Sequence, residues 1–262
     1  MEELANLFFE LSHMDRLELI ILMDEKPSTL TEFSEEIGIS TQEVYRHLSR
    51  LQKVKIVKKT TEGNYTLTPL GEDILLWLPG FKFLQANRDY FTQHNLRNIP
   101  TRFRLRLGEL SEAQQVDQIM VAVNNIERMI DNAEEYVCII SDQIIMSTID
   151  GIMNNLEKGI SMRTVEPKSF HPRPDFLEQY TNKQLETYHR SKMNKLLQEA
   201  TISEIPLVLY LSEKEVGFLG FPNHDNRLDF LGFTSRDKQA HAWCLELFED
   251  VWNKSTVKTV TG

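Results

Sequence analysis

The segment ISTQEVYRHLSRLQKVKIVKKTTEGNYTLTPLG, residues 39–71, contains a helix signal followed at once by a hairpin signal. Ser40 is a good N-cap residue for a helix over Thr41–Lys53. Three apolar residues in that stretch follow the spacing of one helix face: Val44, Leu48 and Leu51. After it, KIVKK and YTLT alternate apolar and polar residues around TTEGN, which is typical of a turn with Gly63 and Asn64 at its tip. The segment therefore predicts a helix and then a hairpin.

Two shorter helix signals precede this segment. DRLELIILMDE has apolar residues at helical spacing, with Ser12 as a possible cap. TLTEFSEEIGIS offers Thr31 as an N-cap and Gly38 as the point where the chain reverses direction. The order helix, helix, turn, helix, hairpin is that of a winged helix-turn-helix, in which the last helix enters the major groove and the wing lies along the DNA backbone.

The face of the third helix opposite its apolar seam carries groups that contact bases and phosphates. Between Ser40 and Lys59 there are six basic residues and a single acid, Glu43. We expect double-stranded DNA as the partner of this patch. The expected DNA-binding residues are Ser40, Thr41, Gln42, Tyr45, Arg46, Ser49, Arg50, Lys55, Lys58 and Lys59. The alternative is a winged helix that docks onto another protein and whose lysines are only solvated.

The whole chain has 262 residues and a formal net charge of -10, so its overall field repels phosphate. Any contact with nucleic acid must then be confined to a patch, and a dimer is expected because one small patch binds DNA weakly. The first residues carry acids where a secretory signal needs bases, and their apolar runs are too short to span a membrane. The sequence thus predicts a cytoplasmic protein without membrane contact, and two buried, reduced cysteines, Cys138 and Cys244.

The chain length favours two domains joined by a helical connector: a DNA-binding domain over 1–70, a connector over 71–112 and an α/β regulatory domain over 113–262. Thr68 and Pro69 predict a helix start, and Pro79 and Gly80 predict a break. Four large side chains of the connector could pair with a second copy or pack on their own domain: Phe83, Leu84, Tyr90 and Phe91. Three nearby arginines are expected on a solvated helical face: Arg102, Arg104 and Arg106.

The second half of the sequence predicts a mixed β-sheet with helices. YVCIIS and ISMRTVEP are strand candidates on either side of a helical segment, which implies a parallel pair with a right-handed crossover. Up to four further strands and the amphipathic segment SRDKQAHAWCLELFEDVWNK follow. The expected fold class is α+β or α/β, with an N-terminal winged helix-turn-helix, a helical connector and a C-terminal mixed-sheet α/β domain of the sensor type.

No pattern for catalysis, cofactor or metal binding is found, because Gly-rich phosphate loops, a nucleophile elbow and paired metal ligands are missing and the histidines are scattered. The chain is therefore expected to be neither an enzyme nor a cofactor protein. Ligands of layered α/β folds bind beyond the carboxyl ends of parallel strands. This predicts an effector site at Ser141, Asp142, Arg163 and Glu166. The alternative role for Asp142 is that of a helix cap.

The chain resembles the archaeal winged-helix transcriptional regulators of the methanogenesis and filamentation regulator family. The resemblance covers the whole chain through YTLTPLG, HNLRNIP, YVCIIS, GISMRTVEP, EIPLVLYLSEKEVGFLGF and LDFLGFTSRDKQAHAWCLELFEDVW. It implies a homodimeric DNA-binding regulator whose C-terminal domain senses an effector or dimerises.

That second domain is similar to the phospholipase D-like modules of archaeal sugar-responsive regulators. The catalytic His-x-Lys motif of phospholipase D enzymes does not occur in this sequence, so the resemblance implies the scaffold without the catalyst. A phosphodiesterase-like enzyme tethered to a winged helix is the remaining alternative, next to the protein-docking adaptor.

Overall fold

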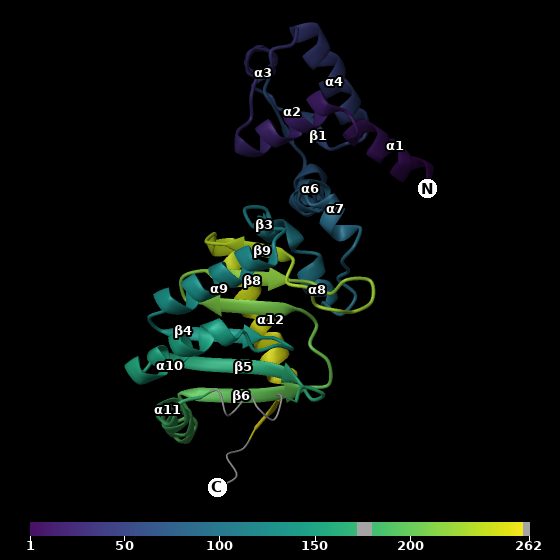
Figure 1. Cartoon of the computed structure of the whole chain (residues 1–262). Helices are drawn as coiled ribbons and strands as arrows, with labels where there is room; N and C mark the ends of the chain where they lie inside the picture. Colours follow the sequence, from purple (N-terminus) through teal and green to yellow (C-terminus); the bar gives the residue numbers. More distant parts are fainter. Residues whose placement is uncertain (172–179, 259–262) are drawn as a thin grey trace. The chain divides into compact units, whose positions relative to one another are not determined.

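The computed structural model describes residues 1–171 and 180–258 of the chain. The chain divides into two compact units, Met1–Phe81 and Lys82–Gly262 (Figure 1). The division falls inside helix α6 (Leu78–Ala86). Among the described residues, no helix is both long and apolar enough to cross a membrane.

The N-terminal unit contains helices α1 (Glu2–Leu11), α2 (Met14–Glu25), α3 (Leu30–Ile37) and α4 (Thr41–Lys53), strands β1 (Val57–Lys59) and β2 (Tyr65–Leu67), and helix α5 (Pro69–Leu75). The order from α2 to β2 is the predicted winged helix-turn-helix. Helix α1 precedes it and was not predicted.

Two predicted helix starts differ from the structure. Ser12 ends α1, where its hydroxyl donates to the Phe9 carbonyl, and does not cap α2. The N-cap of α3 is Thr29 and not Thr31, because Glu32 three residues after Thr29 completes a capping box that Thr31 has no partner to form. Gly38 ends α3 with a φ of 78°, the left-handed conformation that glycine adopts without strain.

The core of the N-terminal unit lies where α2, α3 and α4 meet. The apolar seam of α4 is fully buried there, as predicted: Val44, Leu48 and Leu51 are all at 0% exposure. Leu19 and Phe33 pack against this seam from the two preceding helices. The buried seam leaves the opposite face of α4 toward solvent.

The hairpin β1–β2 is antiparallel and forms the predicted wing, with Lys59 opposite Tyr65. Gly63 adopts a φ of 94° in the predicted turn. Thr68 then caps α5 through the Gly71 amide, with Pro69 at the first helical position, as predicted. Gly71 lies so close to the backbone of Ile56 that a Cβ added to it would be 2.2 Å from the Ile56 carbonyl oxygen. This close approach fixes α5 against the base of the wing.

The predicted connector, 71–112, is not a separate element of the structure. Its break comes at Leu76 and Trp77. Helix α6 begins at Leu78, so Pro79 lies in the first turn of a helix instead of ending one, a position that proline fits. Beyond the break lie α6, α7 (Arg88–Phe91), α8 (Thr101–Arg104) and the 3-10 helix η1 (Leu107–Leu110). Phe83 and Tyr90 are 2% and 4% exposed in the core of the C-terminal unit, so they pack on their own domain and are not free to pair with a second copy.

The C-terminal unit is built on an eight-stranded mixed sheet in the order β10-β6-β5-β4-β7-β8-β9-β3. Its strands are β3 (Gln114–Val116), β4 (Tyr136–Ile140), β5 (Ser161–Pro167), β6 (Leu197–Ile202), β7 (Val208–Ser212), β8 (Val216–Gly220), β9 (Gly232–Ser235) and β10 (Thr256–Val257). Strands β4, β5 and β6 are parallel, which confirms the predicted crossover, and the other pairs are antiparallel.

Helices cover both faces of the sheet (Figure 1). On one face lie α9 (Ile119–Asn132), the 3-10 helix η2 (Met146–Thr148), α10 (Ile149–Lys158) and α11 (Asn182–Met193). The other face packs on α12 (Lys238–Lys254) and on the segment from α6 to η1. Successive residues of β4 alternate between the two cores, Val137 on the α9 side and Cys138 on the α12 side, as side chains of a central strand must.

Candidate nucleic-acid interface

Helix α4 begins with a reciprocal capping box. The Ser40 hydroxyl accepts a hydrogen bond from the Glu43 amide, and the Glu43 carboxylate accepts from the Ser40 amide and hydroxyl. These bonds, led by the one from the Ser40 side chain, lower the pKa of Glu43. Glu43, the single acid between Ser40 and Lys59, thus takes part in the cap of α4, and its side chain is held in place.

The solvent face of α4 presents the predicted base-reading residues together. Thr41, Gln42 and Arg46 are exposed, and Tyr45 keeps 56% of its surface accessible. A hollow of about 640 Å³ runs along this face, and Gln42, Tyr45 and Arg46 contribute to its lining together with Ser49 and Lys53. Amide, phenol and guanidinium groups therefore share one accessible surface, as the helical periodicity predicted.

Arg46 and Arg50 are one helical turn apart but differ in their partners. The Arg50 Nε and Nη2 atoms donate to the Glu10 carboxylate at 2.8 and 2.9 Å, and its guanidinium lies 5.4 Å from the centre of the Phe9 ring. Throughout Met1–Phe81, every residue of which is described, Arg46 is the single arginine without a hydrogen bond or an ion pair. Arg46 is free to meet a ligand, whereas Arg50 holds α1 against α4.

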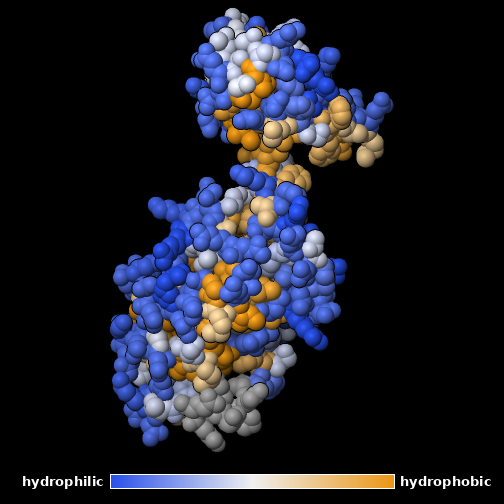
Figure 2. All heavy atoms as spheres, turned by 45° about the horizontal axis from the view of Figure 1, so that its top comes forward, coloured by the Kyte–Doolittle hydropathy of each residue, from blue (hydrophilic) through white to orange (hydrophobic). Residues whose placement is uncertain are grey.

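Three lysines continue the positive surface beyond α4. Lys55 is exposed and has a φ of 64°, in the tight connection to the wing. Lys58 and Lys59 are exposed on β1, and the Lys59 ammonium lies 5.4 Å from the centre of the Tyr65 ring. Most acids of the unit precede this stretch, in α1, α2 and α3, so the sequence separates the two signs of charge. In Figure 2 the surface of this unit is mainly hydrophilic, and apolar side chains gather on one part of it.

The C-terminal unit contains a cavity of about 140 Å³ between the sheet and helices α10 and α11. Two of the residues expected at an effector site line it: Ser141, at the carboxyl end of β4, and Glu166, near the end of β5. The Ser141 hydroxyl accepts a hydrogen bond from the Tyr210 hydroxyl at 3.2 Å, and Glu166 forms an ion pair with Lys258. Burial raises the pKa of Tyr210 to about 12, so this phenol stays protonated as a donor.

Arg163 and Asp142 do not join that lining. Arg163 points to the opposite face of the sheet, because side chains alternate along β5 and Thr164 takes the cavity side. Its guanidinium pairs with Glu249 of α12 and stacks over Phe248. Asp142 caps no helix in the structure; its Oδ1 atom is buried without a hydrogen bond among the described residues, and burial raises its pKa.

The lining includes residues that the sequence analysis did not name, among them Tyr188, Glu199 and Tyr210. The Tyr188 hydroxyl donates to the Glu199 carboxylate at 3.0 Å, and Lys192 pairs with the same carboxylate at 2.8 Å. Only the pairing of β5 with β6 brings Glu199 beside Thr164, and no local pattern carries that information.

Two arginines of the predicted connector and both cysteines have structural roles. Arg102 pairs with Asp250, and Arg106 pairs with both Glu109 and Glu246, which raises the pKa of Arg106. These ion pairs tie η1 and α8 to α12. Cys138 and Cys244 are free and buried, as predicted, and burial raises the pKa of the Cys138 thiol to about 11.

The sequence matches no protein-family model and no curated protein. Among solved structures, it is similar to TrmBL2, an archaeal chromatin protein whose structure shows a novel mode of DNA binding (16% identity, 87% of each chain covered, TM-score 0.44). It is also similar to Nuc, a phospholipase D family member from Salmonella typhimurium (14% identity, 51% of this chain and 88% of that chain, TM-score 0.34). A third neighbour is IdeR from T. acidophilum (14% identity, 88% of this chain and 94% of that chain, TM-score 0.24). Likenesses this distant assign the chain to no family.

Proposed function

We propose that the protein is a sequence-specific DNA-binding transcriptional regulator and has no enzymatic activity. The observation that carries the proposal is the unpaired Arg46 beside Gln42 on the exposed face of α4. In the winged helix-turn-helix arrangement this helix enters the major groove. Guanidinium and amide groups are the side chains that read guanine and adenine edges through paired hydrogen bonds. Thr41 and Tyr45 complete the proposed base-reading face.

Phosphate contacts are assigned to the residues that border this face. Lys55, Lys58 and Lys59 follow α4 along the base and first strand of the wing, where a DNA backbone passes in winged-helix complexes. Ser49 supplies a hydroxyl donor on the same surface, and Ser40 is assigned a smaller part because its hydroxyl already donates to the Glu43 carboxylate. We assign Arg50 a smaller part, because Glu10 already neutralises its charge.

A homodimer fits the charge distribution best. The net charge of -10 opposes DNA binding outside the α4 and wing surface, so one copy has few phosphate contacts. Two copies on an inverted repeat double those contacts and match the symmetry of the site. Helix α1 leaves Leu4 and Phe8 46% and 56% exposed, which provides apolar surface for association.

The cavity of the C-terminal unit is the proposed effector site. It is mostly apolar, and its polar groups include the carboxylates of Glu166 and Glu199, which suits a small organic ligand with hydrogen-bond donors. A thermal-shift screen of small metabolites against wild type and Thr164→Met tests this assignment. A hit whose shift persists in Thr164→Met contradicts it, because the larger side chain fills the cavity.

Selection of bound fragments from a random double-stranded DNA pool, at near-physiological salt, tests the function itself. An enriched inverted repeat is the expected result. The absence of DNA affinity even at low salt contradicts the proposal and favours the protein-docking adaptor, because the exposed lysines would then only solvate the wing.

Two substitutions separate base reading from backbone binding. We expect Arg46→Ala to weaken binding to the selected site by about 10- to 100-fold while binding to random DNA changes little, since a paired contact to a base contributes about 1–3 kcal/mol. Lys58→Ala should weaken both and lower the salt dependence of binding by about one ion. Fluorescence anisotropy at several salt concentrations measures both effects. Arg190→Ala, an exposed arginine of α11, is the matched control; equal losses on both DNAs for Arg46→Ala contradict the assigned roles.

A further inference from the structure

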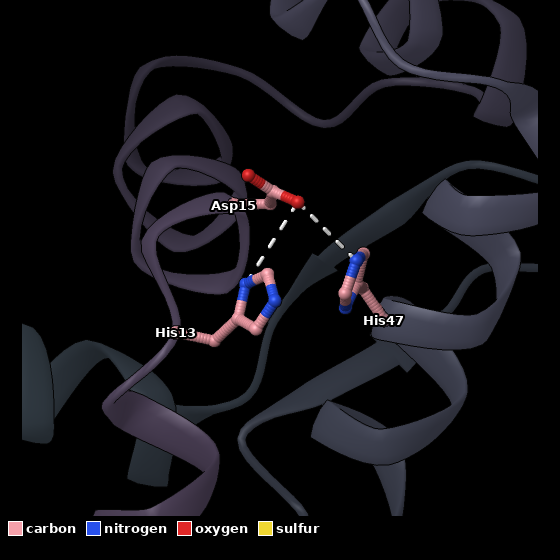
Figure 3. A group of neighbouring side chains, drawn as sticks. All are labelled: His13, Asp15 and His47. Atoms are coloured by element: carbon pink, nitrogen blue, oxygen red, sulfur yellow. Dashed lines mark ion pairs between the residues drawn. The ribbon is translucent and has the colours of Figure 1, made fainter.

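Two histidines and an aspartate meet beneath the recognition helix. His13 directly precedes α2, Asp15 lies in the first turn of α2, and His47 projects from α4. Figure 3 shows the three side chains pointing toward one another from the two helices. One ligand atom of each lies within 4.8 Å of the corresponding atoms of the other two. The fold thus gathers two imidazoles and one carboxylate that are separated in the sequence.

The distances between the ligand atoms of this cluster match those between metal ligands better than those between hydrogen-bond partners. The Asp15 Oδ2 atom lies 3.4 Å from His47 Nε2 and 3.8 Å from His13 Nδ1. Hydrogen bonds between such atoms are about 2.7–3.2 Å long. Ligand atoms that each lie about 2.0–2.1 Å from a tetrahedral ion are roughly 3.4 Å apart. The pair of Asp15 and His47 therefore already has the separation that an ion between them would impose.

His47 supplies a second, independent indication. Its side chain is 5% exposed, and the Nε2 atom that faces Asp15 has only the long contact of 3.4 Å to that carboxylate. Among the described residues its Nδ1 atom also has no hydrogen-bond partner. The nitrogen that faces the cluster therefore has no hydrogen bond of ordinary length, which is costly for a buried imidazole unless a ligand at that atom satisfies it.

The surrounding charges limit how strongly a cation is held. Arg16 and Arg46 both act on His47, and their charges oppose a second cation nearby. Arg16 is itself paired with Glu10, whereas the Asp15 carboxylate faces the two histidines directly. The His13 ring stays 44% exposed and can turn toward an ion, so access from solvent is open.

We propose that His13, Asp15 and His47 bind a divalent transition-metal ion such as Zn²⁺. Two imidazole nitrogens and one carboxylate oxygen are a donor set for zinc, cobalt, nickel or iron(II), and they do not suit Mg²⁺ or Ca²⁺, which take oxygen ligands. The three protein ligands leave at least one coordination position to water. Bound metal connects the start of α2 directly to α4, and so fixes the helix that presents Arg46.

Cobalt(II) titration of the metal-free, full-length protein tests the site without any DNA, so its outcome is independent of the proposed function. Tetrahedral or five-coordinate Co²⁺ absorbs visible light, which reports both stoichiometry and ligand geometry. We expect one Co²⁺ per chain, displaced by Zn²⁺ and not by Mg²⁺. Zn²⁺ should also raise the unfolding temperature of the wild type.

The variants are chosen to keep the fold intact. His13→Ala alters an exposed side chain and Asp15→Asn keeps the shape of the carboxylate, and each should weaken Co²⁺ binding at least tenfold. His189→Ala removes an exposed histidine of α11 and should leave it unchanged. Circular dichroism of the metal-free variants confirms their folding, and His13→Ala decides the matter if Asp15→Asn does not fold. No Co²⁺ spectrum with the wild type, or equal affinity in wild type and His13→Ala, overturns the proposal.

Discussion

Replacing Glu10 with glutamine should destabilise the N-terminal unit by about 3 kcal/mol, the lower end of what removing one partner of a buried ion pair costs. Glu10 is 6% exposed and binds Arg50 through both carboxylate oxygens, and Arg16 lies 3.3 Å from the same carboxylate. Without the charge of Glu10, the buried Arg16 keeps an uncompensated charge. Arg50, which is 38% exposed at its side chain, can turn to solvent, and this keeps the loss moderate.

Hydrogen exchange of the intact protein measures this effect within one unit. Peptides from α1, α2 and α4 should exchange faster in Glu10→Gln, while peptides from β4 and β7 keep their protection. The matched control is Glu157→Gln, which removes the partner of the exposed Lys183 and should change protection little. Unchanged protection of α4 in Glu10→Gln contradicts the structural role of the ion pair.

The same carboxylate makes the N-terminal unit sensitive to acid. The hydrogen bond from Arg50 is the largest cause that lowers the pKa of Glu10 below its ordinary value of 4.5, against the opposing effect of burial. A lowered pKa in the folded state means that the contribution of Glu10 is complete above pH 4.5 and is lost as the pH falls through the folded-state pKa. Wild type should therefore lose protection of α4 in that window, and Glu10→Gln should lose less there.

Replacing Trp243 with alanine should cost the C-terminal unit about 3–5 kcal/mol, as is usual for a large aromatic residue removed from a core. Trp243 is fully buried on α12, packs edge-on against Phe103 and donates its indole N–H to the Phe103 carbonyl at 3.1 Å. The substitution leaves a cavity where α8 packs on α12, and the Phe103 carbonyl keeps its hydrogen bond from the Arg106 amide. Urea denaturation followed by circular dichroism gives the loss.

Trp252→Ala is the matched control on the same helix. Trp252 is partly exposed and stacks on Phe248 at the end of α12, so its removal should cost less than half as much. Comparable losses for the two tryptophans contradict the view that the segment from α6 to η1 is anchored through Trp243.

The local signals of the winged helix were sufficient to predict it. The seam of Val44, Leu48 and Leu51, the cap at Ser40 and the turn at Gly63 depend on neighbours within a few residues, and each was confirmed. The parallel pair β4 and β5 was predictable for the same reason, because a crossover helix and its two strands are contiguous in the chain.

What the sequence did not reveal depends on contacts across long separations. Glu10 meets Arg50 only after α1 folds back on α4, and His47 meets His13 and Asp15 only after α2 packs on α4. The sequence left open whether Phe83 packs on a second copy or on its own domain, because an aromatic helix face looks the same in both cases, and the structure shows the second. The face to which Arg163 points depends on strand register, which is set by pairing with β4 and β6.

The two edges of the large sheet limit how copies of this protein can associate. The outermost strands, β3 and β10, have three and two residues, and each already pairs with its inner neighbour. An extended segment from another molecule would find few backbone groups to continue the ladder at either edge, which disfavours sheet-to-sheet polymerisation. We therefore expect the proposed association of two copies to rely on helical surfaces. Its strength should consequently respond to point substitutions on α1 far more than to competing β-strand peptides.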